Sequence, residues 1–169
     1  MGGGYFPPVT TKHEMNSDWI IRRATEADAD YIIGFQQQMA LESEGLELDR
    51  AKLEPGVKAA LKDPTKGEYL LVSRQTDSGL TIAGSLMLTY EWSDWNNSRY
   101  MWVQSVYIRP EFRRQGAYRA LYSTVRKMAK EAGINQIRLY VDKSNTTGIS
   151  TYKALGMEQS HYLMFEETL

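Results

Sequence analysis

A stretch rich in arginine surrounds a single glycine at residues 109–122, RPEFRRQGAYRALY. Gly116 stands where a predicted strand gives way to a predicted helix, with Arg113, Arg114 and Arg119 around it. The first turn of a helix carries unpaired backbone N–H groups and a partial positive charge, and a glycine lets an anion approach them closely. The pattern therefore predicts a phosphate-binding turn. A solvated basic helix start, in which Arg113 and Arg114 balance Glu111, explains the spacing equally well.

The composition restricts the classes of protein to which the chain can belong. It has 169 residues, a formal net charge of −1, no cysteine and two histidines. Disulfides, thiolate metal sites and a cysteine nucleophile are excluded, and a histidine-rich zinc site is disfavoured. The near-neutral charge argues against a general nucleic-acid binder, and no apolar run reaches the roughly 20 residues of a membrane helix. We expect a cytoplasmic protein that binds neither metal, nucleic acid nor membrane.

Hydrophobic patterning predicts the elements that position the arginine-rich turn. A helix over 116–132 has one continuous apolar face and ends at a glycine; that face carries Leu121, Val125, Met128 and Ala132. Further helices are expected over 25–42, from Asp49 to before Pro64 with a break or kink near Pro55, and over 145–156. Strands are expected over 19–23, 67–74, 80–92, 99–108, 134–142 and 160–167.

The order of these elements indicates the fold class and the domain organisation. Consecutive hairpin strands precede a strand–helix–strand unit, which predicts an α/β chain with a mixed sheet and helices on both faces. Residues 1–17 are rich in glycine and proline, so we expect them to be disordered, or a leader added ahead of Met15. Residues 18–169 are long enough to form a single domain.

Three segments in the right order resemble the GNAT superfamily of N-acetyltransferases. VYIRPEFRRQGAYRALY resembles the acetyl-CoA-binding segment, whose pattern is Arg/Gln-x-x-Gly-x-Gly/Ala after a strand and a proline. Arg113 and Gly116 match this pattern, whereas Tyr118 stands where it has Gly or Ala. IIRRATEADAD resembles the first strand and helix start, and NTTGISTYKALGM resembles the late Asn…Tyr-x-x-x-Gly helix. The resemblance covers about residues 18–167.

The resemblance implies a GNAT-like acyl-CoA N-acyltransferase fold with a central splayed sheet, and acetyl-CoA as cosubstrate without a metal. Strands 99–108 and 134–142 would separate to admit the acetyl group. Main-chain groups of the earlier strand would hold the pantetheine arm, at Val106, Tyr107 and Ile108. Asn145 would also contact the cofactor. Backbone amides from Arg114 to Arg119 would hold the pyrophosphate. The cofactor-binding residues of the turn would be Arg113, Arg114, Gln115, Gly116, Ala117, Tyr118 and Arg119.

The resemblance also implies two residues at the reaction centre. Tyr152 would donate a hydrogen bond or proton to the leaving thiolate. A phenol has a pKa of about 10 and a thiol about 8.5, so full transfer runs uphill by roughly 2 kcal/mol. Periodicity alone instead favours a tyrosine that packs the core. Gln104 stands where many relatives carry a glutamate; an amide cannot accept a proton, but it can position a water.

The base and the acceptor pocket have several candidates. Glu91, Glu44 and Glu68 could each accept a proton, although any single one is more often a surface carboxylate. Aromatic residues around one hairpin could line an acceptor pocket or pack an edge of the core: Tyr90, Trp92, Trp95 and Trp102. The acidic run 42–49, ESEGLELD, could attract a cationic amine or be a solvated loop. An amine that loses its proton to water would need no dedicated base.

We therefore expect an N-acetyltransferase in which a primary amine of a small molecule or peptide attacks acetyl-CoA directly in a ternary complex. The substrate residues would include Glu91, Trp92 and Glu44. The alternative is a catalytically weak acyl-CoA-binding or sensor module, which Gln104 favours and Tyr152 disfavours. The chain could act as a monomer or a homodimer.

Overall fold

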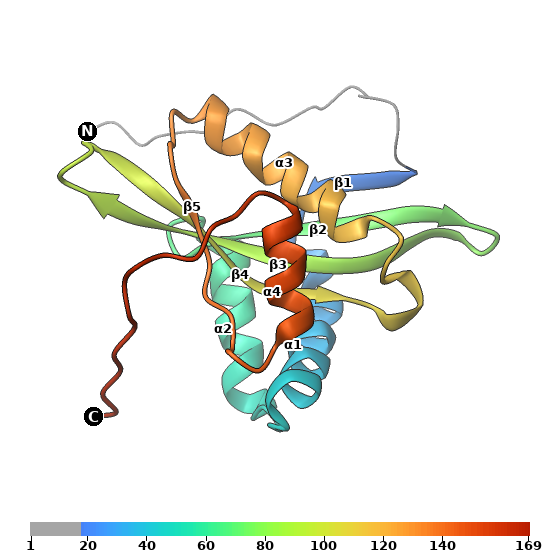
Figure 1. The fold of residues 1–169 in the computed structure, drawn as a ribbon. Helices are drawn as coiled ribbons and strands as arrows, with labels where there is room; N and C mark the ends of the chain where they lie inside the picture. Colours follow the sequence, from blue (N-terminus) through green and yellow to red (C-terminus); the bar gives the residue numbers. More distant parts are fainter. Residues whose placement is uncertain (1–17) are drawn as a thin grey trace.

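The structure is a computed structural model that describes residues 18–169, shown in Figure 1. The expectations for residues 1–17 lie outside this range. The strands are β1 (Trp19–Arg23), β2 (Glu68–Thr76), β3 (Gly79–Ser93), β4 (Ser98–Ile108) and β5 (Ile137–Arg138). The helices are α1 (Ala29–Glu44), α2 (Arg50–Lys62), α3 (Ala117–Glu131) and α4 (Thr146–Ala154), with short 3-10 turns η1 (Glu26–Asp28) and η2 (Pro110–Phe112).

The strands form one mixed sheet in the order β1-β2-β3-β4-β5. β1, β2 and β3 each pair antiparallel with the next strand, and short turns connect β2 to β3 and β3 to β4. β5 returns through α3 and therefore pairs parallel to β4. The mixed sheet predicted from the element order is confirmed.

Helices cover both faces of this sheet (Figure 1). On one face, Leu121 and Val125 of α3 join a core with Leu86 and Leu88 of β3. On the other face, residues of α1 and α2 pack with Leu71 of β2; they include Ile32, Ile33, Val57 and Ala60. Each fully buried aliphatic side chain contributes about 1.5–3 kcal/mol, so the two apolar layers fix which helix lies on which face.

The sheet opens at β4. Met87 pairs with Gln104 and Ser85 pairs with Tyr107, so β4 has one extra residue between these pairs, and Ser105 within this bulge has a φ of 50°. Bulges bend and twist the strand that carries them. β5 pairs with β4 only at Met101 and Trp102. Beyond that point β4 continues without a parallel neighbour among the described residues, which gives the splayed sheet expected.

Several predicted elements differ from the structure. The strand expected over 134–142 is reduced to Ile137–Arg138, because β4 turns away at its bulge and leaves 139–142 without a pairing edge. Residues 157–169 form no strand, and Tyr162, Leu163 and Phe165 are exposed. A sequence of strand-forming residues becomes a strand only where another strand's hydrogen-bonding groups face it.

The first two helices also depart from expectation. α2 continues through Pro55, its sixth residue, without a break, because burial of Val57 and Ala60 outweighs the one backbone hydrogen bond that proline removes. α1 extends to Glu44, so the acidic run 42–49 begins inside a helix and becomes a loop only after Gly45. No helix within residues 18–169 is long and apolar enough to span a bilayer.

Candidate active site

The turn before α3 has the backbone geometry of an anion site. Gly116 is in the left-handed region with a φ of 88°, and so is Arg114 with a φ of 60°. The main-chain N–H groups from Arg114 to Arg119 have no hydrogen-bond acceptor within residues 18–169. A left-handed non-glycine residue costs of order 1–3 kcal/mol and is often found where function requires it. Unpaired backbone N–H groups and the strained backbone of Arg114 therefore occur together at the predicted phosphate-binding turn.

Two side chains of this turn hold its shape. Arg113 donates from Nε to the Ile108 carbonyl oxygen at 2.7 Å and from its guanidinium to Glu42 at 2.6 Å. The Gln115 amide donates to the Glu111 carbonyl oxygen at 2.7 Å and accepts from Arg74 at 2.8 Å. Both side chains therefore bind the protein in this structure, and cofactor binding at Arg113 and Gln115 stays a prediction.

The other charged side chains of the turn are available to a ligand. Arg114 and Arg119 have no ion pair within the described part of the chain, and both are exposed. The turn also accepts a hydrogen bond from the Trp19 indole to the Gln115 carbonyl oxygen, at 3.1 Å. The result is an anchored loop that presents backbone donors with two free guanidinium groups nearby.

The open edge of β4 leads to this turn. Arg109 N–H donates to the Ala83 carbonyl oxygen on β3 at 2.8 Å. Alternation along a strand then directs the main-chain groups of Ile108 and Val106 to the opposite side, where β4 has no strand neighbour within residues 18–169. The Ile108 carbonyl is taken by Arg113, whereas the Val106 groups remain available. This edge fits an extended ligand arm with amide groups.

Tyr152 lies beside the turn, as α4 packs its ring edge-on against Tyr118 with ring centres 5.8 Å apart. Its hydroxyl has no hydrogen-bond partner in the described residues, and burial raises the pKa of the phenol above its usual value. The group therefore stays protonated at neutral pH and can act as a donor. Its role in the reaction remains a prediction.

Gln104 lies at the β4 bulge, where the sheet begins to open. Its Nε2 donates to Thr89 Oγ1 on β3 at 2.5 Å, and its Oε1 accepts from the Tyr140 hydroxyl at 3.5 Å. Tyr140 belongs to the segment after β5. The amide is thus held by β3 and by the segment after β5, and its role in the site is likewise still a prediction.

The model of the Acetyltransferase (GNAT) family matches residues 30–157 of this chain. The chain belongs to this family. Thialysine N-epsilon-acetyltransferase of Bos taurus is 28% identical over 145 residues, which cover 82% of this chain and 84% of that protein. These matches favour an acetyltransferase over an acyl-CoA-binding module without activity.

Solved structures agree with the family. A possible acetyltransferase from Clostridium difficile 630 superposes with a TM-score of 0.81 and 38% identity, covering 89% of this chain and 97% of the other. A predicted acetyltransferase from Clostridium acetobutylicum, solved with acetyl-CoA, has the same fold at a TM-score of 0.70 and 18% identity, covering 88% and 96%. This chain therefore has the GNAT fold and is an N-acetyltransferase of that family.

Two of the three carboxylates considered as bases in this GNAT chain are already paired. Glu91 accepts from the Trp102 indole at 2.7 Å and lies 3.6 Å from Arg138. Glu68 accepts from Tyr90 at 2.8 Å and pairs with Arg23 at 2.7 Å. The carboxylate oxygens of both residues therefore already have partners within the protein.

The end of α1 brings acidic residues to the predicted phosphate-binding turn of this GNAT chain. Glu42 accepts from Arg113 and, at 3.2 Å, from the Tyr107 hydroxyl. Glu44 follows it in the last turn of α1, is exposed, and has no ion pair within the described residues. Of the three candidate bases, Glu44 is the one that the protein leaves free.

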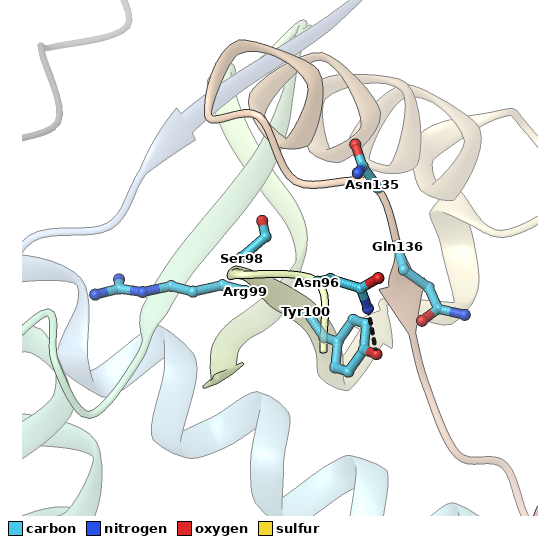
Figure 2. Close-up of a pocket in the computed structure, with 6 residues that line it drawn as sticks. All are labelled: Asn96, Ser98, Arg99, Tyr100, Asn135 and Gln136. Carbon is cyan, nitrogen blue, oxygen red and sulfur yellow. Dashed lines mark hydrogen bonds between the residues drawn. The ribbon is translucent and has the colours of Figure 1, made fainter. Parts of the chain in front are cut away.

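The hairpin aromatics do not gather around one hollow. Trp92 is 60% exposed and Trp95 is 90% exposed, whereas Trp102 packs near Tyr140 with ring centres 6.3 Å apart. Figure 2 shows a hollow at the start of β4, the end opposite Ile108, with Asn96 donating to Tyr100 at 2.8 Å. Its lining residues are Asn96, Ser98, Arg99, Tyr100, Asn135 and Gln136. This hollow is separate from the cofactor turn.

Asn145 caps α4 through its side chain, whose Oδ1 accepts from Gly148 N–H at 2.8 Å. This bond fixes the start of the helix that carries Tyr152, and the contact of Asn145 with the cofactor arm stays a prediction. Thr89, Tyr140 and Glu42 were missed from the sequence. Their contacts join residues at least 15 positions apart, and no local pattern in the sequence marks them.

Proposed function

We propose that this enzyme transfers the acetyl group of acetyl-CoA to the terminal primary amine of a small aliphatic substrate, by direct attack in a ternary complex. The observation that carries the proposal is the open edge of β4 at Val106, which runs into the unpaired N–H groups at Gly116. The name of the Bos taurus relative supports a small amino-acid amine as the acceptor.

The protein would hold the cosubstrate mainly through its backbone. N–H groups from Arg114 to Arg119 would donate to the pyrophosphate, and the guanidinium groups of Arg114 and Arg119 would add positive charge. The main-chain groups of Val106 would hold the pantetheine arm. The bound thioester supplies the activated acetyl group. These donors have no partner within residues 18–169, which supports this assignment.

Tyr152 would donate a hydrogen bond to the sulfur atom that leaves. Burial raises the pKa of its phenol, so the hydroxyl carries its proton throughout the neutral range. A phenol whose pKa exceeds that of a thiol acts better as a hydrogen-bond donor than as an acid that transfers its proton fully. Its edge contact with Tyr118 would hold the ring at the start of α3.

Deprotonation of the amine would not depend on Gln104, because an amide does not accept protons. Gln104 would orient a water or the amine through Oε1 while Thr89 fixes its Nε2. The proton would pass to solvent, or to Glu44 at the end of α1. The rate at low substrate concentration should therefore rise with pH until the acceptor amine itself is deprotonated.

Release of free thiol from acetyl-CoA tests this function. The acceptors are thialysine, lysine and a short peptide with a free N-terminus, and a reaction without amine corrects for hydrolysis. We expect thiol release to depend on the small amines and mass spectrometry to find the acetyl group on the terminal amine. Acetylation of the peptide alone would replace the small-molecule acceptor, and no amine-dependent release at all would refute the proposal.

A further inference from the structure

Tyr118 is the residue of the cofactor turn that departs from the family pattern, and its hydroxyl is buried without a hydrogen bond. The Tyr118 oxygen has no partner within residues 18–169. Its ring stacks on Tyr122, with centres 6.1 Å apart and planes at 27°, and meets the Tyr152 ring edge-on at 5.8 Å. A hydroxyl removed from water without a partner destabilises the protein by about 1–3 kcal/mol.

A phenylalanine would pack as well here and would avoid this cost. The rings of Tyr118, Tyr122 and Tyr152 supply the apolar contact, and none of these contacts needs the Tyr118 oxygen. A buried polar atom that the protein does not satisfy calls for a partner outside the protein. The neighbouring residues limit what that partner is.

We propose that the Tyr118 hydroxyl binds the pantetheine arm of coenzyme A by donating a hydrogen bond to one of its amide carbonyl oxygens. The inference rests on the proposed cofactor site. Tyr118 is two residues after Gly116, and it contacts Tyr152, the predicted donor to the thioester sulfur. Tyr118 therefore lies between the groups expected at the two ends of that arm.

A neutral acceptor suits this position better than the pyrophosphate. The Tyr118 hydroxyl is surrounded by the apolar core of α3 and by tyrosine rings, and no guanidinium or ammonium group stacks on its ring among residues 18–169. Burying a charged phosphate there would cost much free energy, whereas a neutral amide carbonyl can be buried if one hydrogen-bond donor satisfies it. Burial also raises the pKa of Tyr118 well above its usual range, so the donor keeps its proton.

The test compares Tyr118→Phe with Tyr122→Phe, which removes a hydroxyl from the stacked ring one helical turn further along α3. Titration calorimetry measures the affinity of each protein for coenzyme A and for 3′-phosphoadenosine diphosphate, the nucleotide half that lacks the pantetheine arm. Tyr118→Phe should bind coenzyme A about tenfold more weakly, the loss of one hydrogen bond, and should bind the nucleotide half as the unmodified protein does. Tyr122→Phe should leave both affinities unchanged.

Thermal melts give a second readout that is independent of activity. Without ligand, Tyr118→Phe should melt at the same temperature as the unmodified protein or higher, because it removes an unsatisfied buried group. Addition of coenzyme A should raise the melting temperature of Tyr118→Phe by less than it raises that of the unmodified protein.

Equal coenzyme A affinity in Tyr118→Phe and the unmodified protein would overturn the inference. An equal loss for coenzyme A and the nucleotide half would also overturn it, since the contact would then lie at the phosphates. Failure of the unmodified protein to bind coenzyme A would instead refute the proposed cofactor site itself.

Discussion

Replacing Gly116 with alanine separates backbone strain from blockage of the cofactor. The residue has a φ of 88°, and an added β-carbon would find its nearest neighbour, the Trp19 ring nitrogen, at 3.8 Å, which is an ordinary contact. The new methyl group therefore collides with nothing in the protein. Its cost to folding is the left-handed conformation, about 1–2 kcal/mol for an L-residue.

Gly133 provides the matched control at the other end of α3. Its φ is 68°, and an added β-carbon there has no heavy atom within 4 Å. Gly133→Ala should therefore incur a similar backbone strain without approaching the predicted anion site. For a domain of this size, each 1 kcal/mol corresponds to about 2–4 °C in melting temperature, so both variants should remain folded and melt a few degrees lower.

The two variants should differ in their affinity for coenzyme A. At Gly116 the methyl group stands beside the unpaired N–H groups that the pyrophosphate would approach. Loss of one charge-assisted hydrogen bond, about 1.5–3 kcal/mol, weakens binding by about tenfold to a hundredfold. Titration calorimetry should find this loss in Gly116→Ala and an unchanged dissociation constant in Gly133→Ala.

Unchanged affinity for coenzyme A in both variants, each shown to be folded by circular dichroism, would refute the reasoning. The start of α3 would then not be where the pyrophosphate binds. Equal weakening in both variants would show that strain in α3 acts on the site indirectly, and it would refute the argument in the same way.

Three further perturbations test other parts of the structure. Tyr152→Phe should lower kcat by about 10²-fold and leave coenzyme A affinity unchanged in calorimetry, whereas undiminished turnover would make the tyrosine a packing residue. Gln104→Glu should fold and raise the rate near neutral pH by adding a proton acceptor, and Gln104→Leu should lose activity; a fully active Leu variant would remove Gln104 from the site. The hydrogen bonds from Arg22 lower the pKa of Asp28 from 3.8 to about 2. Because that pKa is lower in the folded state, the pair should stabilise the protein by about 2 kcal/mol above pH 4 and lose this contribution as the pH falls through 2; partial exposure of Arg22 can only reduce this value. Asp28→Asn should abolish that pH dependence in urea unfolding, and an unchanged acid profile would contradict the assignment.

The sequence determined the features that depend on neighbouring residues. The apolar positions 121, 125 and 128 fall on one face of α3, and Gly116 and Gly133 mark its two ends, so the helix could be located to within a residue or two. β1 follows from its own apolar run, and β2 to β4 follow from apolar runs separated by short turns. The family resemblance extended this local reading to the function, because its motifs are also short segments.

Tertiary structure decided which of those residues have partners. Residues 160–167 have the composition of a strand but no edge to pair with, because strand pairing depends on groups supplied by another part of the chain. Glu68 and Glu91 have the chemistry of a base, yet their carboxylates are already paired with Arg23 and Arg138. Whether a polar group is free to bind a ligand or accept a proton depends on the residues that the fold places next to it.

The same distinction applies within the cofactor turn. The sequence marked Arg113 and Gln115 by type and spacing, but Glu42 and Arg74, which lie 71 and 41 positions away, decide that these side chains hold the loop. Only the backbone donors and Arg114 and Arg119 are then left for a ligand among the described residues of the turn. Periodicity and motifs assign a residue to a face or a turn. The fold decides whether a distant residue lies close enough to bind its side chain.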